Sequence, residues 1–349
     1  MTIISGDRQT PFVFDHDNQL LVVEAGANLV VAGGYTVTDS EGSTVRNGCT
    51  LGNFGSIYNN FTAVLMTGQN ATVINHASAS IYGADGVVLF GPGAYLDNQG
   101  SIHGQLIGVS SGTSSGRITN SGVISGGIGV FVATEGHLLL ENSGEIRGSA
   151  DAVRYQDGSG YLDIVNSGSM YGGLNLDSAG FCNVRNSGVI EGGVLFGSSD
   201  NTYDGRGGAG GLVDGGDGAD SLRGGADEDT LQGGLGADTL RGGAGEDVFV
   251  YHAVSESRGK TIDLIRAWDS ADLLDLSGID ADSGAKGRQQ LVFGGQIGSA
   301  DPVASGKVQY YRQDGDTYVV ADVNGDAKAD LKLEIAGLVT LNSGDFILG

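Results

Sequence analysis

The chain has 349 residues, 64 of them glycine and three proline, and 42 acidic against 18 basic side chains give a formal net charge of −24. The length is enough for two domains, and a 40% share of hydrophobic residues is enough for sizeable cores. The acidic balance argues against nucleic acid or an anionic membrane as a partner and favours cations.

Cysteine usage and targeting patterns narrow the class further. Cys49 and Cys182 are the two cysteines, too few for a disulfide framework and without the spacing of a zinc site, so we expect both to be inert. No stretch approaches the ~18 apolar residues of a membrane span. Residues 1–14 lack the basic and apolar regions of a cleaved signal peptide. Taken alone, these absences predict a cytoplasmic protein.

A phrase of the type Asn-Ser-Gly-x-Ile recurs between about residues 50 and 200, with 20 to 24 residues between its asparagines. These asparagines are Asn53, Asn75, Asn98, Asn120, Asn142, Asn166 and Asn186. Such a period signals a solenoid, and the short alternating apolar runs between the phrases are typical of strands. We therefore predict a right-handed parallel β-helix over residues 1–200, with residues 1–45 as its N-terminal cap.

Each asparagine of the phrase is expected at a corner of a coil, where Asn tolerates left-handed backbone angles. Stacked coils place these amides ~4.8 Å apart, where they can hydrogen-bond along the axis as a ladder. The phrase resembles repeats in bacterial surface and autotransporter-type β-solenoid passengers.

Residues 215–250 repeat every nine residues: GGDGADSLR, GGADEDTLQ, GGLGADTLR and GGAGEDVFV. Each repeat has a glycine pair, an acid at the sixth position and a large apolar residue at the eighth. A disordered acidic linker does not hold an apolar residue in register over four repeats. The pattern resembles the calcium-binding RTX (repeats-in-toxin) nonapeptide, and we predict a parallel β-roll over residues 201–250.

A calcium ion takes ~6 to 8 oxygen ligands, so one aspartate per repeat is not enough. If each repeat forms half a coil, loops two repeats apart stack and pair Asp220 with Asp238, and Asp229 with Asp247. The resemblance implies that backbone carbonyls complete the ligand set of each calcium ion. We expect about two to four calcium ions or more in all. The carbonyls implied are those of Gly216, Gly218, Gly233 and Leu235 in one site, and of Gly225, Asp227, Gly242 and Ala244 in another.

The segment behind the repeats resembles the C-terminal domain of the serralysin-type secreted metalloproteases, on the stretches DLIRAWDSADLLDLSGI, ADVNGDAKADLKLEIAG and GDFILG. The resemblance implies a β-rich secretion domain over residues 251–349 and export by the type I secretion machinery with an uncleaved C-terminal signal. It also makes Asp263 and Asp272 candidate calcium ligands that close the roll, although one residue is missing between them relative to the family's phrase. The protein is then secreted, and the missing signal peptide is explained.

Two further groups leave alternatives open. Asp322, Asn324, Asp326 and Asp330 are spaced like an EF-hand loop, but position 12 is Leu333 and position 6 is not glycine, so the loop is either a metal site or a polar β-turn. The residues Arg154, Tyr155, Asp157, Tyr161 and Asp163 form the nearest approach to a catalytic set. Their other interpretation is ordinary outward polarity of strands and turns.

The sequence has no HExxH motif, and zinc hydrolysis is not expected. We predict an all-β, secreted, calcium-stabilised protein with a structural or adhesive role at the cell surface or in extracellular matrix, and with itself or surface glycans as further partners. Self-assembly into fibres or layers is part of this hypothesis. The alternatives are a polysaccharide-active lyase or epimerase and a glycan-binding module.

Overall fold

The computed structural model describes residues 1–31, 35–41, 44–156, 159–209 and 211–349. The chain divides into two compact units, residues 1–194 and 195–349. Nearly all regular structure is β, and one 3-10 turn, η1 (Ser343–Asp345), is the single helical element of the described residues. This confirms the predicted all-β class. No helix in the described ranges has the length and apolar character needed to cross a membrane.

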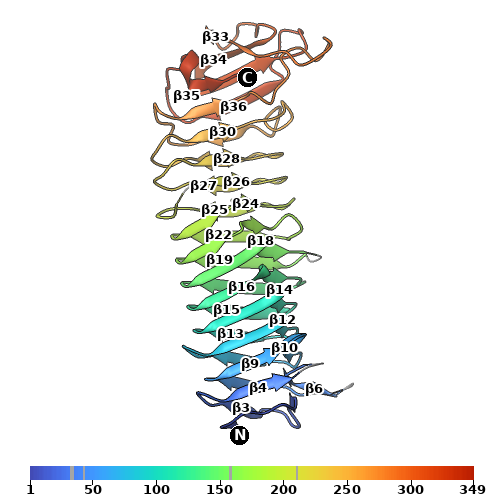
Figure 1. Ribbon diagram of the computed structural model, residues 1–349. Coiled ribbons are helices and arrows are strands. Elements are labelled where there is room, and N and C mark those ends of the chain that lie inside the picture. The colour runs from blue at the N-terminus through green and yellow to red at the C-terminus, as the bar shows by residue number, and fades with distance from the viewer. Residues whose placement is uncertain (32–34, 42–43, 157–158, 210) are drawn as a thin grey trace. The chain divides into compact units, whose positions relative to one another are not determined.

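The first unit is a β-solenoid built from two long parallel sheets (Figure 1). The first sheet contains β1 (Thr2–Ile4), β3 (Leu20–Val23), β8 (Thr50–Asn53), β11 (Thr72–Asn75), β13 (Tyr95–Asn98), β15 (Ser115–Asn120), β17 (His137–Asn142), β19 (Tyr161–Asn166) and β22 (Cys182–Asn186). The second contains β2 (Phe12–Val13), β4 (Asn28–Val31), β5 (Val37–Thr38), β9 (Ser56–Asn59), β10 (Thr62–Met66), β12 (Ser80–Leu89), β14 (Ser101–Ser111), β16 (Val123–Val132), β18 (Glu145–Tyr155), β20 (Ser169–Tyr171), β21 (Leu174–Asn175) and β23 (Val189–Glu191). A small antiparallel pair, β6 (Ser40–Glu41) and β7 (Thr44–Val45), stands apart, and β24 (Val194–Leu195) lies at the division of the chain.

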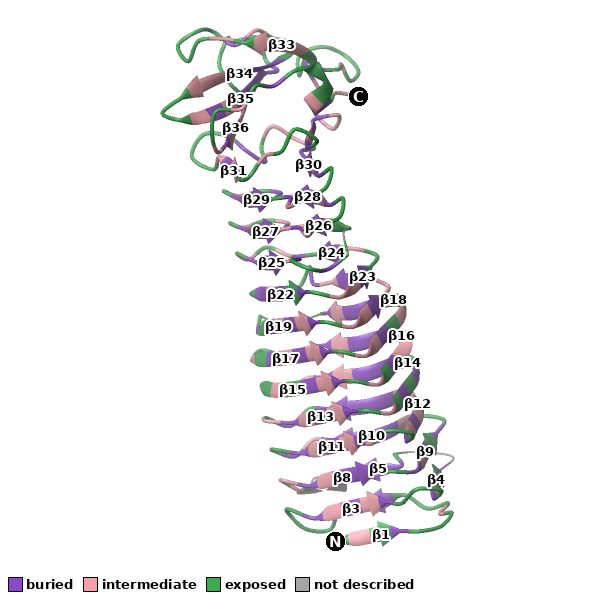
Figure 2. Cartoon of the chain, turned by 90° about the vertical axis from the view of Figure 1, so that its left-hand side faces the viewer, coloured by how far each residue is buried: buried purple, intermediate pink, exposed green. Residues whose placement is uncertain are grey.

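Alternation along each strand places one side chain inside and the next outside, which the burial colours show along the strands (Figure 2). Leu51, Val73 and Leu96 lie in register on successive strands and are fully buried. Identical positions of successive coils therefore stack into apolar columns, which form the core.

Glycine is required where the long strands of the second sheet bend. The register of β12, β14, β16 and β18 shifts at this bend. A Cβ atom at Gly104 or Gly148 would lie 1.7 Å from a backbone carbonyl oxygen of Ile107 or Asp151, a distance that no side chain tolerates. Backbone crowding at the bend thus accounts for part of the high glycine content.

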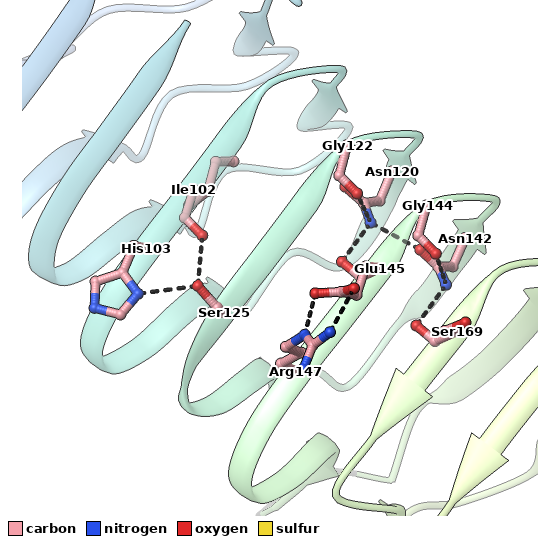
Figure 3. Close-up of polar contacts among 10 residues, drawn as sticks. All are labelled: Ile102, His103, Asn120, Gly122, Ser125, Asn142, Gly144, Glu145, Arg147 and Ser169. Atoms are coloured by element: carbon pink, nitrogen blue, oxygen red, sulfur yellow. Dashed lines mark hydrogen bonds and ion pairs between the residues drawn. The ribbon is translucent and has the colours of Figure 1, made fainter. Parts of the chain in front are cut away.

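The asparagine ladder predicted from the repeat is confirmed. The amide nitrogen of Asn98 donates to the amide oxygen of Asn120 at 2.7 Å. Asn120 donates likewise to Asn142 at 2.7 Å (Figure 3). The other pairs of the seven asparagines repeat this contact at 2.8 Å. The expected left-handed backbone is wrong, since none of the seven has a positive φ. Each ends a strand of the first sheet. Its side chain can be buried because its amide group forms hydrogen bonds with neighbouring asparagines and with backbone carbonyls at the turn.

The second unit begins with short strands that pair in two parallel stacks. One stack contains β25 (Thr202–Asp204), β27 (Ser221–Arg223), β29 (Thr239–Arg241) and β31 (Asp263–Ile265); the other contains β26 (Leu212–Asp214), β28 (Thr230–Gln232), β30 (Val248–Val250), β32 (Leu273–Asp275) and β37 (Phe346–Ile347). Leu222 pairs in register with Leu240, and Leu231 with Phe249. Each nine-residue repeat is therefore half a coil, as predicted.

Beyond the repeats the parallel stack changes to antiparallel pairing. β31 pairs in parallel with β36 (Leu331–Ile335), which continues antiparallel through β35 (Asp316–Asp322) and β34 (Lys307–Gln313), and β33 (Val292–Gln296) completes the sheet. Phe346, in the C-terminal stretch GDFILG where the secretion signal is expected, is buried and pairs with Leu274. The end of the chain is thus part of the last coil of the roll.

Candidate metal centre

Two columns of aspartates run through the loops that precede the strands of the roll. In the first carboxylate column, Asp220, Asp238 and Asp263 stand one above the other. The backbone N–H of Asp220 donates to Oδ1 of Asp238 at 2.8 Å, and that of Asp238 to Oδ1 of Asp263 at 3.0 Å. Below them, the N–H of Asn201 donates to Oδ1 of Asp220 at 2.6 Å. Each carboxylate is therefore fixed by the coil beneath it.

The second carboxylate column repeats the pattern on the other side of the roll with Asp229, Asp247 and Asp272. The N–H of Asp229 donates to Oδ1 of Asp247 at 3.0 Å, and that of Asp247 to Oδ1 of Asp272 at 3.3 Å. Asp263 and Asp272, proposed from the sequence to close the roll, thus lie directly above the last aspartates of the repeats. The two columns therefore contain the four aspartates from the sixth position of the repeats together with Asp263 and Asp272.

The carboxylates of the first column are buried, and none of them forms an ion pair with a cation in the part of the chain that the structure describes. Asp220, Asp238 and Asp263 are 2%, 1% and 0% exposed, and within the described residues the second oxygen, Oδ2, of each has no hydrogen-bond partner of good geometry. The hydroxyl of the buried Tyr251 lies close enough to Asp263 to influence its pKa. A buried, unpaired carboxylate oxygen costs free energy unless a cation or a proton occupies it. One oxygen of each of these three side chains is therefore a buried acceptor that a bound cation would satisfy.

The pKa values of the buried aspartates also indicate that their charged forms are unfavourable without a cation. Burial raises the pKa of Asp220 and of Asp263 to about 8, and the charge of Asp238 adds to both shifts. Burial likewise raises the pKa of Asp238 and of Asp247 to about 6. Without a metal, these groups gain from taking up protons near neutral pH.

Backbone carbonyls of stacked loops border the first column. The N–H of Leu235 donates to the carbonyl of Gly216 at 2.8 Å, and the N–H of Gly218 donates to the carbonyl of Leu235 at 2.7 Å. A Cβ atom at Gly215 would lie 2.6 Å from the carbonyl oxygen of Gly233 and 2.5 Å from Oδ2 of Asp220. The four carbonyl residues predicted for this site therefore come from two adjacent loops, and a carbonyl that accepts one hydrogen bond keeps a second lone pair.

The second column has a similar border. The N–H of Ala244 donates to the carbonyl of Gly225 at 3.2 Å. A Cβ at Gly224 would lie 2.5 Å from the carbonyl oxygen of Gly242 and 2.4 Å from Oδ2 of Asp229, and one at Gly245 would lie 2.7 Å from the carbonyl oxygen of Asp227. A side chain at these glycines would fill the space between carboxylate and carbonyls.

The donor set fits a hard cation. Among the described residues, no group of three or more His, Cys, Asp or Glu side chains converges to hold a metal, so each level must combine two carboxylates with carbonyl oxygens. An all-oxygen set of this kind suits calcium and not zinc or copper. The unpartnered Oδ2 atoms of the first column also fit a hard cation, because they are buried acceptors that a bound ion would satisfy.

Sequence reasoning missed three neighbours of the columns. Glu256 is 8% exposed, and its charge raises the pKa of Asp238 and of Asp263 further. The N–H of Asp269 donates to Oδ2 of Asp272 at 2.8 Å, and Asn201 lies below Asp220 as described. None of these occupies the acid position of a nine-residue repeat, so the repeat gave no signal for them.

A comparison with protein families decides the nature of the repeats. The model of the RTX calcium-binding nonapeptide repeat matches residues 214–249 in four copies. These are RTX calcium-binding repeats. RTX repeats of this kind bind calcium ions, in several copies, and RTX proteins are typically secreted. The match does not reach the C-terminal segment, so the serralysin-type resemblance is not confirmed. No curated protein was found to match the chain.

Three members of the nearest approach to a catalytic set, Arg154, Tyr155 and Asp163, make contacts with residues outside that set. Tyr155 is fully buried, and its hydroxyl donates to the carbonyl of Thr134. Arg154 forms an ion pair with Asp151, and Asp163 with His137 at 2.7 Å. Asp157 lies outside the described residues. The RTX match is evidence neither for nor against catalysis.

The Asp322 loop is held by its own backbone. Oδ1 of Asp322 accepts from the N–H groups of Asn324 and Gly325, and its Oδ2 from Ala327 at 2.9 Å. Asn324 donates to Asp330 at 2.8 Å. Ala327, at the position that is glycine in EF-hands, has φ +66°. The loop is a polar turn with satisfied carboxylates, unlike the first column.

An outward row of side chains on the second sheet of the solenoid bears on glycan binding. Tyr58, Tyr82 and His103 occupy one register position, with ring centroids 4.9 Å and 5.1 Å apart. The row continues through Ser125, which His103 contacts at 2.9 Å, to Arg147 (Figure 3). Because the rings stack on one another, their faces are largely covered, and this row favours a structural ladder over a platform for sugar rings.

Proposed function

We propose that this protein is an extracellular, calcium-dependent structural or adhesive protein of the cell surface or matrix. The observation that carries the proposal is the pair of buried carboxylate columns, the first of which contains buried Oδ2 atoms that a cation would satisfy. The RTX match and the typical secretion of RTX proteins support the location. The solenoid contributes a rigid body of stacked coils, and we assign it no catalytic role.

The proposed ligands follow from the stacked loops. In the first site, Asp220 and Asp238 supply carboxylate oxygens, and Gly216, Gly218, Gly233 and Leu235 supply carbonyls. In the second, Asp229 and Asp247 act with the carbonyls of Gly225, Asp227, Gly242 and Ala244. Asp263 and Asp272 close the two columns. Calcium bound at these positions would neutralise the carboxylates and link successive coils.

This chemistry couples folding to location. Where calcium is scarce, the columns lack their counter-ions, and the roll is destabilised by the burial of unpaired carboxylates. Where calcium is abundant, its binding free energy becomes folding free energy. Export as an unfolded chain by type I secretion fits this dependence, because the buried Phe346 of the proposed signal would be accessible before the last coil forms.

Self-assembly is the finer part of the proposal. β1 pairs with β3 on one side, and no strand among the described residues pairs with its other edge. Ile3 on this strand is 47% exposed. A free parallel edge with exposed apolar side chains can pair with a second molecule, which motivates assembly into fibres or layers.

The test is to purify the protein in a chelator, add calcium, and follow circular dichroism and particle size together. Calcium should produce a cooperative gain of β signal, and larger particles should follow. If the β signal is the same before and after calcium, calcium-coupled folding is wrong. If the protein folds with calcium and stays monomeric, the assembly hypothesis is wrong and the calcium proposal stands.

A further inference from the structure

Three arginines form a row on the outer side of the roll. Arg223 and Arg241 pair in register on β27 and β29. The next coil places Arg266 beside Arg241, because the N–H of Arg266 donates to the carbonyl of Leu240 at 2.8 Å and Leu240 pairs with Ile265. The intervening Leu222, Leu240 and Ile265 are buried, so the arginines point outward. We call Arg223, Arg241 and Arg266 the arginine row.

The three guanidinium groups of the row form no ion pair among the described residues. No ion pair or side-chain hydrogen bond is found for these three arginines within the described residues. Nε of Arg223 is buried and has no hydrogen-bond partner among the residues that the structure describes. Like charges on directly adjacent strands destabilise a sheet. A bound anion would relieve the repulsion between these arginines, although the protein as a whole is strongly acidic.

The neighbouring arginine shows what the row lacks. Arg206 forms an ion pair with Asp204 at 2.6 Å. Asp204 lies in register below Arg223, at the lower end of the same row. The protein thus pairs the arginine at this end with its own carboxylate and leaves the next three positions open to carboxylates from outside.

We propose that the arginine row binds an extended acidic polysaccharide of the polyuronate class. The strands place one guanidinium group every ~4.8 Å along the axis, and a polyuronate carries one carboxylate per sugar ring, a unit of similar length. Guanidinium groups bind carboxylates through paired hydrogen bonds. The flat, strand-built row suits a linear chain better than a compact ligand.

The acidic surface around the arginine row disfavours nucleic acid as a ligand. A phosphate backbone needs a wide basic surface to release its counter-ions, whereas this row is a single file in a chain of net charge −24. The inference rests on the proposed function in one respect, since the row forms only when calcium has folded the roll. It deepens that function by naming the class of matrix polymer that the protein would hold.

The experiment measures binding of a fluorescent oligogalacturonate, too short to gel, to the full chain in calcium buffer by anisotropy. The test variant is Arg241→Gln. The matched control is Arg288→Gln, which removes the same charge from an exposed side chain between β32 and β33. Circular dichroism and calcium stoichiometry of each sample report whether the roll is folded.

Wild type and the Arg288 variant should bind alike, and Arg241→Gln should bind about tenfold more weakly, the effect of losing one charge-assisted contact. Raising the salt concentration should weaken wild-type binding. Equal affinity of Arg241→Gln and wild type, no binding by folded wild type, or equally tight binding of a single-stranded DNA of the same charge would each overturn the inference. A wild type that does not fold with calcium would instead refute the proposed function, so the two failures are distinguishable.

Discussion

Replacing Asp238 by asparagine should change stability in opposite directions with and without calcium. Asp238 stands in the middle of the first carboxylate column, between Asp220 and Asp263. Asparagine keeps the Oδ1 acceptor for the N–H of Asp220, so the hydrogen bond between coils survives. The substitution therefore removes the charge of the carboxylate and little else.

With calcium, the variant loses binding free energy. One ion with a dissociation constant of roughly 10⁻⁴ to 10⁻³ M, at about 10 mM calcium, stabilises a folded protein by about 1.4 to 2.7 kcal/mol. Asp238 borders two levels of the column, one shared with Asp220 and one with Asp263. The expected loss is therefore about 3 to 5 kcal/mol if both levels are occupied.

Without calcium, the same change should stabilise the fold. Burial raises the pKa of Asp238 to about 6, so near pH 8 the folded, metal-free protein holds an unfavourable charge there. Removing it should gain roughly 1 to 2 kcal/mol after allowance for solvent screening. The sign of the effect thus depends on the metal and not on the side chain's shape.

The assay is urea unfolding in calcium, and folding by an osmolyte such as TMAO in chelator, both followed by circular dichroism. Asp314→Asn is the control, because Asp314 is an exposed turn residue with φ +54°, which asparagine also tolerates. The control should change neither midpoint. Destabilisation of Asp238→Asn in both conditions would mean that the carboxylate is an ordinary structural acceptor, and the metal argument would fail.

Three further predictions test other parts of the structure. First, burial raises the pKa values of Asp220 and Asp263 to about 8 and those of Asp238 and Asp247 to about 6. Groups with a raised pKa stabilise the fold at low pH and lose this contribution as the pH rises through the folded-state pKa, so the chelated protein should need less osmolyte at about pH 5 than at about pH 9, and calcium should bind more weakly on acidification. The reverse order of osmolyte midpoints would refute this sign. Second, Asn120→Ala should cost about 2 kcal/mol or more in urea unfolding, since Asn98 loses an acceptor and Asn142 a donor inside the solenoid; a cost below about 0.5 kcal/mol would show that the ladder adds nothing. Third, burial raises the pKa of the Cys182 thiol to about 12 and also raises that of Cys49, so a maleimide should label neither in the native protein and both in urea; fast labelling of the native protein would contradict the structure.

Much of the fold could be predicted because its repeats are short and regular. The asparagine period fixed the stacking of the coils in the solenoid, and the ladder of Asn98, Asn120 and Asn142 follows from it. The backbone angle at these asparagines was predicted wrongly, since they end strands and do not occupy left-handed corners. A period states which residues stack, and it carries no information on the dihedral angles at which they do so.

The candidate site was predictable to the same extent. The acid at the sixth position of each repeat identified the aspartates, and half a coil per repeat identified which of them pair. Glu256 and Asn201 lie outside the repeats, and only the folded chain brings them beside Asp263 and Asp220. The arginine row was missed because Arg266 follows a longer loop, so its alignment with Arg241 depends on the pairing of β29 with β31.

The sequence by itself determined the all-β class, the length of the repeat that forms each coil, and the expectation of a bound cation. These follow from local spacing and from the excess of acidic over basic side chains. The tertiary structure alone decided which oxygens are buried and unpartnered, and which outward cations share a face. Burial and alignment depend on segments far apart in the chain, and a carboxylate costs free energy only where those segments exclude water from it.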